Sequence, residues 1–223
     1  WIQYKYCNQK GITRKEQIKR RVWAQFWTIS FLTGQRPIEI LKMKWCDISI
    51  NQKDDAFGKK FNRVIYIPVE SSKTGKPREI VSPIADNLKT LKKWYRQKPF
   101  ELDPKPEHYI FPRLTLTDIQ NNIPTTKVAL EKRLKAVMKG SEKAGVWDSQ
   151  GRRITLYSSR HWHITDAIMR DVPIWDIAQN CGTSEQYITS TYAHISTRMR
   201  SEVLTKNQGA HSMKEETKKK ILE

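Results

Sequence analysis

Apolar residues spaced three and four positions apart predict that most of this chain is helical. The first such segment covers residues 13–33, where one helical stripe contains Val22, Phe26 and Ile29. Gly34 follows directly, and glycine commonly ends helices because it adopts a left-handed backbone without strain. The same spacing predicts further helices over residues 37–44, 86–98 and 126–143.

The last third of the chain has the same helical spacing. Ser158 or Ser159 is expected to cap a helix, because a serine hydroxyl accepts a hydrogen bond from a backbone N–H of the first turn. Gly182 ends a later, short helix, and Ser184 caps the next one. The predicted helices cover residues 158–169, 173–182 and 184 to beyond 192, with a final one near 197–205.

Three segments between the second and third helices are predicted to be β-strands: residues 45–50, 62–69 and 77–84. The last two flank the segment SSKTGK, whose Gly75 marks a turn. Two strands joined by a short turn pair in the antiparallel direction. The sequence therefore predicts an α+β fold, in which a mostly helical domain contains a small three-stranded antiparallel sheet.

The charge balance indicates the kind of partner. The 223 residues include 41 Lys and Arg against 23 Asp and Glu, which gives a formal net charge of +18. Such an excess attracts polyanions, and its spread along the whole chain favours a long one, namely nucleic acid. A helix that binds a membrane surface would instead gather its cations on one face, opposite bulky apolar residues. A solvated basic surface is the remaining alternative.

The composition also bears on compartment and cofactors. No stretch approaches the roughly 18 apolar residues of a membrane span, and no signal peptide is recognisable. Cys7, Cys46 and Cys181 are widely spaced without a CxxC pair, which is typical of reduced thiols in an intracellular protein. His161 and His163 are two apart, whereas a metal shared on a helix needs a spacing of three or four. We expect no membrane, no metal and no cofactor.

Three residues far apart in the chain are candidates for phosphate chemistry: Arg36, Arg160 and Tyr192. A tyrosine that attacks a phosphodiester keeps the energy of the broken bond in the new ester, so a strand is cut and rejoined without ATP or metal. Free tyrosine has a pKa of about 10, so positive charge or a base must supply about 4 kcal/mol at neutral pH. Two guanidiniums supply such charge and match the oxygens of phosphate. Taken singly, the residues are equally compatible with surface cations and a packed helix tyrosine.

Four segments of the sequence together have the order and spacing of a known family. They are TGQRPIEILKMKWCDI around Arg36, SSKTGKPREIVSPI, LYSSRHWHIT around Arg160, and CGTSEQYITSTYAHI around Tyr192. In the last segment, the tyrosine lies nine residues after Thr183. Together the segments resemble the catalytic domain of the tyrosine recombinases, the phage-integrase family, over about residues 13–200.

The resemblance implies a specific division of roles. Arg36 and Arg160 would hold the scissile phosphate while Tyr192 attacks it, forming a 3′-phosphotyrosine link and freeing a 5′-hydroxyl. Lys73, in the turn of the predicted hairpin, would protonate the leaving oxygen as general acid. Glu39, three residues after the first arginine, would hold the arginine segment in place. The reaction would need neither a metal nor ATP.

Two positions depart from the family pattern. The family usually has histidine three residues before the second arginine, where this chain has Tyr157, and histidine or tryptophan where it has Thr183. Both replacements can donate a hydrogen bond to phosphate, but a phenol is a poor base at neutral pH and threonine is short. The sequence therefore predicts either an active enzyme with an unusual base or a slow one.

The two histidines near the second arginine are expected to lie away from the chemistry. His161 falls in line with Ile164 and Ile168, which predicts a place at the edge of the core. His163 falls in line with charged residues of the same helix, which predicts a side chain that faces solvent or DNA. Neither is expected to replace the missing family histidine.

The resemblance also suggests how the chain is organised. Residues 1–205 are expected to form the catalytic domain and residues 206–223 a polar, flexible tail. Because the chain begins with Trp1 rather than Met, it is expected to be a fragment that lacks the family's amino-terminal DNA-clamping domain. The expected partner is double-stranded DNA, bound by a tetramer, although the free fragment is compatible with a monomer. The expected location is the cytoplasm of a bacterium or of a phage-infected host cell.

The leading functional hypothesis is site-specific recombination, with integration or excision of a mobile element as the biological role. A second hypothesis is a DNA-binding relative with weakened catalysis, which the departures at positions 157 and 183 motivate. A third is a type I topoisomerase-like enzyme, which uses the same chemistry to relax supercoils. The joint presence of Arg36, Lys73, Arg160 and Tyr192 argues against a purely passive binder.

Overall fold

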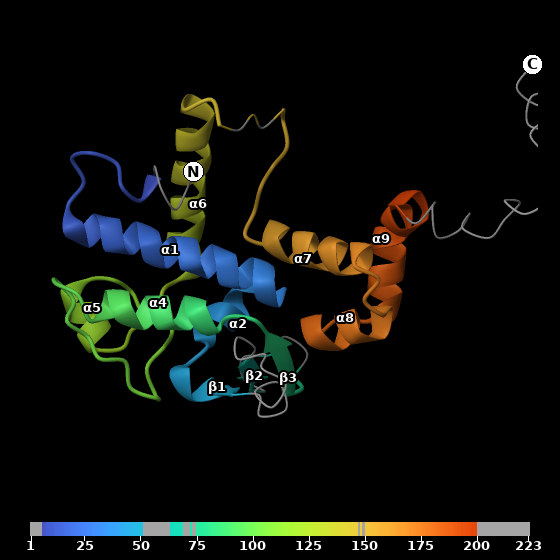
Figure 1. The fold of residues 1–223 in the computed structure, drawn as a ribbon, viewed down its shortest axis with the longest axis horizontal. Helices are drawn as coiled ribbons and strands as arrows, with labels where there is room; N and C mark the ends of the chain where they lie inside the picture. The colour runs from blue at the N-terminus through green and yellow to red at the C-terminus, as the bar shows by residue number, and fades with distance from the viewer. Residues whose placement is uncertain are drawn as a thin grey trace, which may run out of the picture.

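The computed structural model describes residues 6–50, 63–68, 72, 75–146, 148 and 150–199, without the side chains of residues 50 and 193–199. Helices dominate this part of the chain, and the strands lie together on one side of it (Figure 1). The helices are α1 (Arg14–Thr33), α2 (Pro37–Lys42), α4 (Ala85–Tyr95), α5 (Leu116–Gln120), α6 (Lys127–Lys143), α7 (Ser158–Met169), α8 (Ile174–Cys181) and α9 (Glu185–Met199). A 3-10 turn, η2 (Trp45–Asp47), precedes the strands β1 (Ile48–Ile50), β2 (Arg63–Ile67) and β3 (Arg78–Ser82).

α1 is the central helix, because its apolar stripe is buried among the other elements. Thr13 caps its first turn, where the hydroxyl accepts a hydrogen bond from the N–H of Glu16 at 3.2 Å. Phe26 and Ile29, on the predicted stripe, are buried. α4 packs along one side of this helix and α7 packs at its carboxyl end (Figure 1). The predicted helix and its end at Gly34, which has φ +63°, are confirmed.

The three strands form one antiparallel sheet in the order β1-β2-β3, as the sequence predicts. Ile65 of β2 pairs with Ile48 of β1 and with Ile80 of β3. Buried isoleucines alternate with exposed side chains such as Val81, so one face of the sheet packs on the core. The side chain of Asn180 accepts a hydrogen bond from the N–H of Val81 at 3.2 Å, which ties β3 to α8.

Two separate clusters of buried apolar side chains hold the fold together. The larger cluster joins α1, α4, α6 and the sheet. The smaller cluster joins α7, α8 and α9, and consists of Ile164, Ala167, Ile168, Ile177, Ala178, Cys181, Ile188 and Tyr192. The predicted nucleophile, Tyr192, is therefore part of a small core that fixes the last three helices to one another.

The start of α7 differs from the prediction. Its N-cap is Tyr157, and neither Ser158 nor Ser159 caps the helix. Instead the hydroxyl of Ser158 accepts a hydrogen bond from the N–H of Thr155 at 3.0 Å, and that of Ser159 donates to the carbonyl oxygen of Leu156 at 2.9 Å. Both serine hydroxyls therefore form hydrogen bonds with the backbone of the turn that precedes the helix.

The end of the described chain also differs from the prediction. α9 continues without a break from Glu185 to Met199, so no separate helix begins near residue 197. The N–H of Tyr187 donates to the hydroxyl of Ser184 at 3.1 Å, which confirms the predicted cap of this helix. The remaining part of the predicted final helix and the predicted tail, 200–223, lie outside the described residues.

Candidate active site

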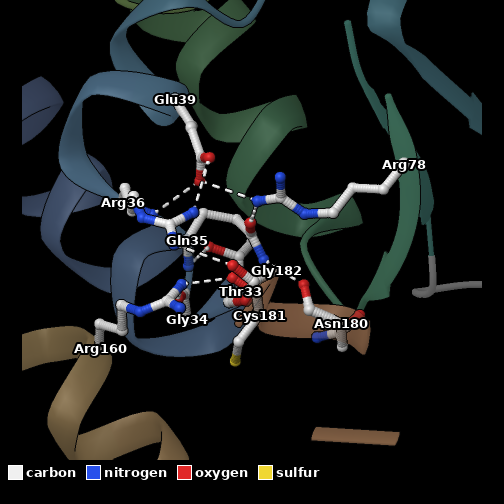
Figure 2. Close-up of polar contacts among 10 residues, drawn as sticks. All are labelled: Thr33, Gly34, Gln35, Arg36, Glu39, Arg78, Arg160, Asn180, Cys181 and Gly182. Carbon is white, nitrogen blue, oxygen red and sulfur yellow. Dashed lines mark hydrogen bonds and ion pairs between the residues drawn. The ribbon is translucent and has the colours of Figure 1, made fainter. Parts of the chain in front are cut away.

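Arg36 and Arg160 come together at the carboxyl end of α8, although they are far apart in the chain. Arg36 is the N-cap of α2, and its Nη2 donates to the carbonyl oxygen of Gly182 at 2.8 Å. Arg160 lies in the first turn of α7, and its Nη1 donates to the carbonyl oxygens of Cys181 at 2.5 Å and Gly34 at 2.8 Å. The two guanidiniums therefore contact two consecutive carbonyls of the chain (Figure 2).

This arrangement follows from the chemistry of helix ends. The last carbonyls of a helix have no partner within it and lie at the negative end of its dipole, where cations are favoured. Gly34 ends α1 with φ +63°, and Gly182 ends α8 with φ +64°. In that left-handed conformation the backbone turns away from the helix axis, so the last carbonyls are accessible to the two arginines.

Glu39 lies beside the two arginines as a fully buried carboxylate. Its Oε1 is 3.1 Å from Nη1 of Arg36, and its Oε2 is 2.8 Å from Nη2 of Arg78, an arginine on β3. Oε2 also accepts a hydrogen bond from the backbone N–H of Arg36 at 3.0 Å. Figure 2 shows the two guanidiniums approaching the carboxylate from opposite sides. Glu39 thus binds Arg36 through both its side chain and its backbone.

Arg78 is a third arginine at the site, and sequence reasoning missed it. Its Nη2 donates to Oε1 of Gln35 at 2.5 Å and to Oε2 of Glu39 at 2.8 Å. Its Nε and Nη1 are buried without a hydrogen-bond partner among the described residues. A signal was present in the sequence, because Arg78 is two residues from Ile80 and alternate residues of a strand share a face. An arginine on the buried face of a strand needs an anionic partner.

The site contains more positive than negative charge. Arg36 and Arg78 form ion pairs with the carboxylate of Glu39, whereas Arg160 forms no ion pair among the described residues. Burial lowers the pKa of Arg160, and the neighbouring charges of Arg36 and Arg78 act in the same direction. Arginine nevertheless stays protonated at physiological pH. The unbalanced charge therefore favours the binding of an anion between the guanidiniums.

Both arginines predicted to bind phosphate keep donors for an outside acceptor. A guanidinium has five N–H groups. Among the described residues, Arg36 uses two side-chain donors in the contacts above, and Arg160 also uses two. Three N–H donors therefore remain on each of the two guanidiniums. That number is enough for both arginines to contact two oxygens of one phosphate.

Tyr192 lies on α9 with its side chain in the smaller core, and is only 4% exposed. Its Oη is 2.6 Å from Nδ1 of His161 on α7. The pKa of this phenol is raised to about 12, chiefly by burial and also by nearby Tyr187, although the charge of Arg160 acts to lower it. The hydroxyl therefore needs a proton acceptor before it is an effective nucleophile at neutral pH.

The structure contradicts the predicted position of His163, whereas His161 lies at the edge of the smaller core, where the sequence predicts it. His161 is exposed and contacts Tyr192, whereas His163 is half-buried and its Nδ1 is 2.8 Å from the carbonyl oxygen of Phe31. Burial lowers the pKa of His163. The prediction placed His163 in line with charged residues of its helix, but Arg160, three residues earlier on the same side, is only 7% exposed and belongs to the buried stripe of α7.

The structure describes two of the three remaining predicted site residues. Tyr157 is 40% exposed at the start of α7, where its backbone N–H donates to the hydroxyl of Thr155 at 3.2 Å. Thr183 follows the end of α8, and its backbone N–H donates to the carbonyl oxygen of Ala178 at 3.0 Å. Lys73 lies outside the described residues.

Two further findings concern metals and membranes. Within the described ranges, no three histidine, cysteine, aspartate or glutamate side chains are grouped so as to hold a metal ion. None of the helices described there is long and apolar enough to cross a bilayer. Cys7 and Cys181 are buried free cysteines, and Cys46 is an exposed one.

Comparisons with known proteins relate this chain to one protein family by sequence and to several solved structures by fold. The model of the phage integrase family matches residues 12–199. A comparison with curated protein sequences gives no significant match. The family match therefore covers every described element from α1 to α9.

Three solved structures have a similar fold. The site-specific recombinase XerH, bound to palindromic difH substrate in a post-cleavage complex, is 16% identical with a TM-score of 0.57, over 92% of this chain and 49% of its own. XerA recombinase is 17% identical with a TM-score of 0.53, and the match covers 88% of this chain and 65% of the XerA chain. The Tn1549 transposon integrase, in complex with transposon right end DNA, is 15% identical with a TM-score of 0.56. The match covers 90% of this chain and 62% of the integrase chain. This chain thus corresponds to about half of the XerH chain.

Proposed function

Because this chain belongs to the phage integrase family, we propose that it cuts and rejoins DNA strands through a covalent 3′-phosphotyrosine intermediate. The observation that carries the proposal is the convergence of Arg36 and Arg160 on the consecutive carbonyls of Cys181 and Gly182. These carbonyls directly precede α9, the helix that bears Tyr192. Oη of Tyr192 is 2.6 Å from Nδ1 of His161, the residue after Arg160, which supports a place for the tyrosine near a phosphate between the arginines.

In the proposed reaction, Arg36 and Arg160 hold the scissile phosphate with their remaining donors and stabilise the charge that builds up on it. Oη of Tyr192 attacks the phosphorus, and the bond from phosphorus to the 5′-oxygen breaks. Lys73 gives the leaving oxygen its proton. Rejoining runs the same steps in reverse, and no external energy is needed because the phosphotyrosine ester keeps that of the broken bond.

Four other residues have supporting roles in this proposal. Glu39 fixes the position of Arg36, and Arg78 forms an ion pair with the second oxygen of the Glu39 carboxylate. Tyr157 and Thr183, at the start of α7 and just after α8, act as further hydrogen-bond donors to the phosphate. None of the four takes part in bond making or breaking.

We further propose double-stranded DNA as the substrate and site-specific recombination, in the integration or excision of a mobile element, as the role. The structures of XerH and of the Tn1549 integrase contain difH substrate and transposon right end DNA. The net charge of +18 is suited to a long polyanion. Assembly into a tetramer on DNA is part of the same proposal.

A DNA-binding relative with weakened catalysis is the second candidate. One observation favours it: the phenol of Tyr192 is buried, and its pKa is raised to about 12. Tyr157, at the position where the family usually has histidine, is also a phenol and a poor base. Such a protein would occupy DNA sites but would form the covalent intermediate very slowly.

A covalent-capture assay tests the proposed function. Nicked duplexes of randomised sequence lose a short fragment after cleavage, so the protein cannot rejoin the strand and stays attached. The wild-type chain is expected to form an adduct that survives denaturing electrophoresis, and Tyr192→Phe is expected to form none. Tyr66→Phe changes an exposed tyrosine of β2 and should leave the yield unchanged.

Two results would contradict strand transfer. One is a wild-type chain that forms no adduct, and the other is an adduct that persists in Tyr192→Phe. Tight DNA binding by a wild-type chain that forms no adduct would favour the second candidate.

A further inference from the structure

The hydrogen bond between His161 and Tyr192 joins an exposed imidazole to a buried phenol. His161 lies in the first turn of α7, immediately after Arg160, and α7 packs against α9. The Oη to Nδ1 distance is 2.6 Å, and the two rings are tilted by 44°. The candidate nucleophile therefore has a nitrogen base in direct contact with its hydroxyl.

The proposed reaction needs such a base. A phenol with a pKa of about 12 is ionised in only about one molecule in 10⁵ at pH 7. The positive charge of Arg160 lowers this pKa but does not offset the effect of burial. A bound phosphate, which is itself an anion, would oppose ionisation further.

The other residues of the proposed site do not supply this base. Tyr157 is a phenol, and a threonine hydroxyl such as that of Thr183 accepts no proton at neutral pH. Lys73 already has the task of protonating the leaving oxygen. Arg36 and Arg160 stay protonated and can only donate.

We propose that His161 is a catalytic residue of this reaction, the general base that takes the proton of Tyr192. As Oη attacks, the O–P bond to tyrosine forms, and the phenolic proton passes to Nδ1 of His161. The bond between phosphorus and the 5′-oxygen breaks, and that oxygen takes a proton from Lys73. On rejoining, His161 returns the proton to Oη, so protons and charges balance over the cycle. This proposal rests on the strand-transfer function proposed above.

The surroundings of the pair suit this exchange. When Nε2 of the imidazole carries its hydrogen, Nδ1 has the lone pair that accepts from Oη. The exposed ring can then pass its proton to water. The groups whose charges act on the phenol are Arg160 on α7, Cys181 at the end of α8 and Tyr187 on α9. Only the first of these is a permanent cation, and it favours the phenolate once the proton has left.

The alternative is that His161 only holds the tyrosine ring in place. His161→Gln separates the two roles, because the amide oxygen still accepts a hydrogen bond but cannot take up a proton at neutral pH. His108→Gln is the matched control, since it makes the same change in a histidine of the loop between α4 and α5. His161 is exposed, so both variants are expected to fold.

The experiment measures the single-turnover rate of adduct formation on nicked DNA between about pH 5 and about pH 9. The wild-type chain and His108→Gln should share one pH profile, because the second variant leaves the proposed base in place. In His161→Gln, the rate at pH 7 should fall by about 10²- to 10⁴-fold. It should then keep rising about tenfold per pH unit toward the pKa of the phenol.

Chemical rescue provides a second readout that a structural role would not give. Free imidazole in solution can enter the space left in His161→Ala and should restore adduct formation there, but not in Tyr192→Phe. A His161→Gln variant with the wild-type pH profile, at any absolute rate, would overturn the base assignment and leave strand transfer intact. A wild-type chain that forms no adduct dependent on Tyr192 would instead overturn the strand-transfer function, and the base assignment with it.

Discussion

Glu39 is a fully buried carboxylate whose two oxygens contact two different guanidiniums, those of Arg36 and Arg78. Ions taken out of water lose several kcal/mol of hydration each, so a buried carboxylate persists only where its partners are well placed. Removing the carboxylate charge leaves two cations, both largely buried, without their counterion. Glu39 therefore ties the stability of the domain to the geometry of its proposed phosphate site.

Glu39→Gln tests this connection. The amide has nearly the same shape but no charge, so the free energy of unfolding should fall by about 3 kcal/mol. Adduct formation should fall at least about tenfold, because the first arginine loses its anchor. The measurements are urea denaturation and the covalent-capture assay. Glu79→Gln, on the exposed face of β3, removes the same charge and should change neither. Equal stability of the two variants would contradict the role given to Glu39.

Sequence reasoning at this scale selected arginines that the structure brings together, but it did not predict all of their contacts. The motifs selected Arg36, Arg160 and Tyr192, and the structure brings the two arginines together on consecutive carbonyls. A helical wheel gives angles between residues but does not say which side is buried. His163 was predicted to face solvent or DNA, but it is half-buried, because the buried side of α7 includes the neighbouring Arg160. Only tertiary contacts, here with two carbonyl oxygens, explain why an arginine lies inside.

At the scale of elements, two helix ends position the site. Gly34 and Gly182 both have positive φ, and both lack room for a side chain. A Cβ at Gly34 would lie 2.3 Å from the ring of His163, and one at Gly182 would lie 2.5 Å from Cζ of Arg78. These close approaches let α1 and α8 present their last carbonyls to Arg160.

Gly182→Ala tests the close approach at the end of α8. The variant has two costs, a strained left-handed alanine of about 1 kcal/mol and displacement of the guanidinium of Arg78. Gly145→Ala is a matched control, because it has the same φ of +64° with nothing within 4 Å of the added carbon. Thermal unfolding and adduct formation should both be impaired more in Gly182→Ala than in Gly145→Ala. Equal effects in both variants would show that only backbone strain matters.

Much of the element layout was predictable from local patterns. The long helices, the glycine ends and the three strands follow from periodicity and turn residues, which act over a few positions. The single-turn helix α5 was missed, because so short a segment contains too few positions to show a period. Residues 45–47 were wrongly predicted as the start of the first strand, whereas they form the 3-10 turn η2. The cap of α7 was assigned to the wrong residue, since two consecutive serines offer the same local signal and both bond the preceding turn instead.

At the scale of the whole molecule, excess positive charge is present both overall and at the site. The chain has a net charge of +18, and at the site the guanidiniums of Arg36, Arg78 and Arg160 outnumber the carboxylate of Glu39. DNA phosphates would balance both excesses and release the counterions condensed on DNA. Binding without regard to sequence is therefore expected to accompany any specific recognition.

The salt dependence of binding tests this picture. If about six phosphates are contacted, affinity for a duplex should fall about 10³-fold between about 50 mM and about 200 mM salt. Fluorescence anisotropy of a labelled duplex measures the effect. Tyr192→Phe should give the same slope as the wild-type chain, because the hydroxyl takes part in chemistry and not in charge neutralisation. An affinity that does not change with salt would remove DNA as the main partner.

The central claim is that Arg36, Arg160 and Tyr192 form one site that cuts phosphodiesters. The most direct measurement is to digest the trapped protein–DNA adduct with trypsin and identify the residue that carries the DNA. Residues 171–198 form one tryptic fragment that contains both Tyr187 and Tyr192, so fragmentation of this peptide distinguishes the two. The predicted result is a nucleotide 3′-phosphate on Tyr192 alone. Attachment to Tyr187, to any other residue, or through a 5′-phosphate would contradict the claim.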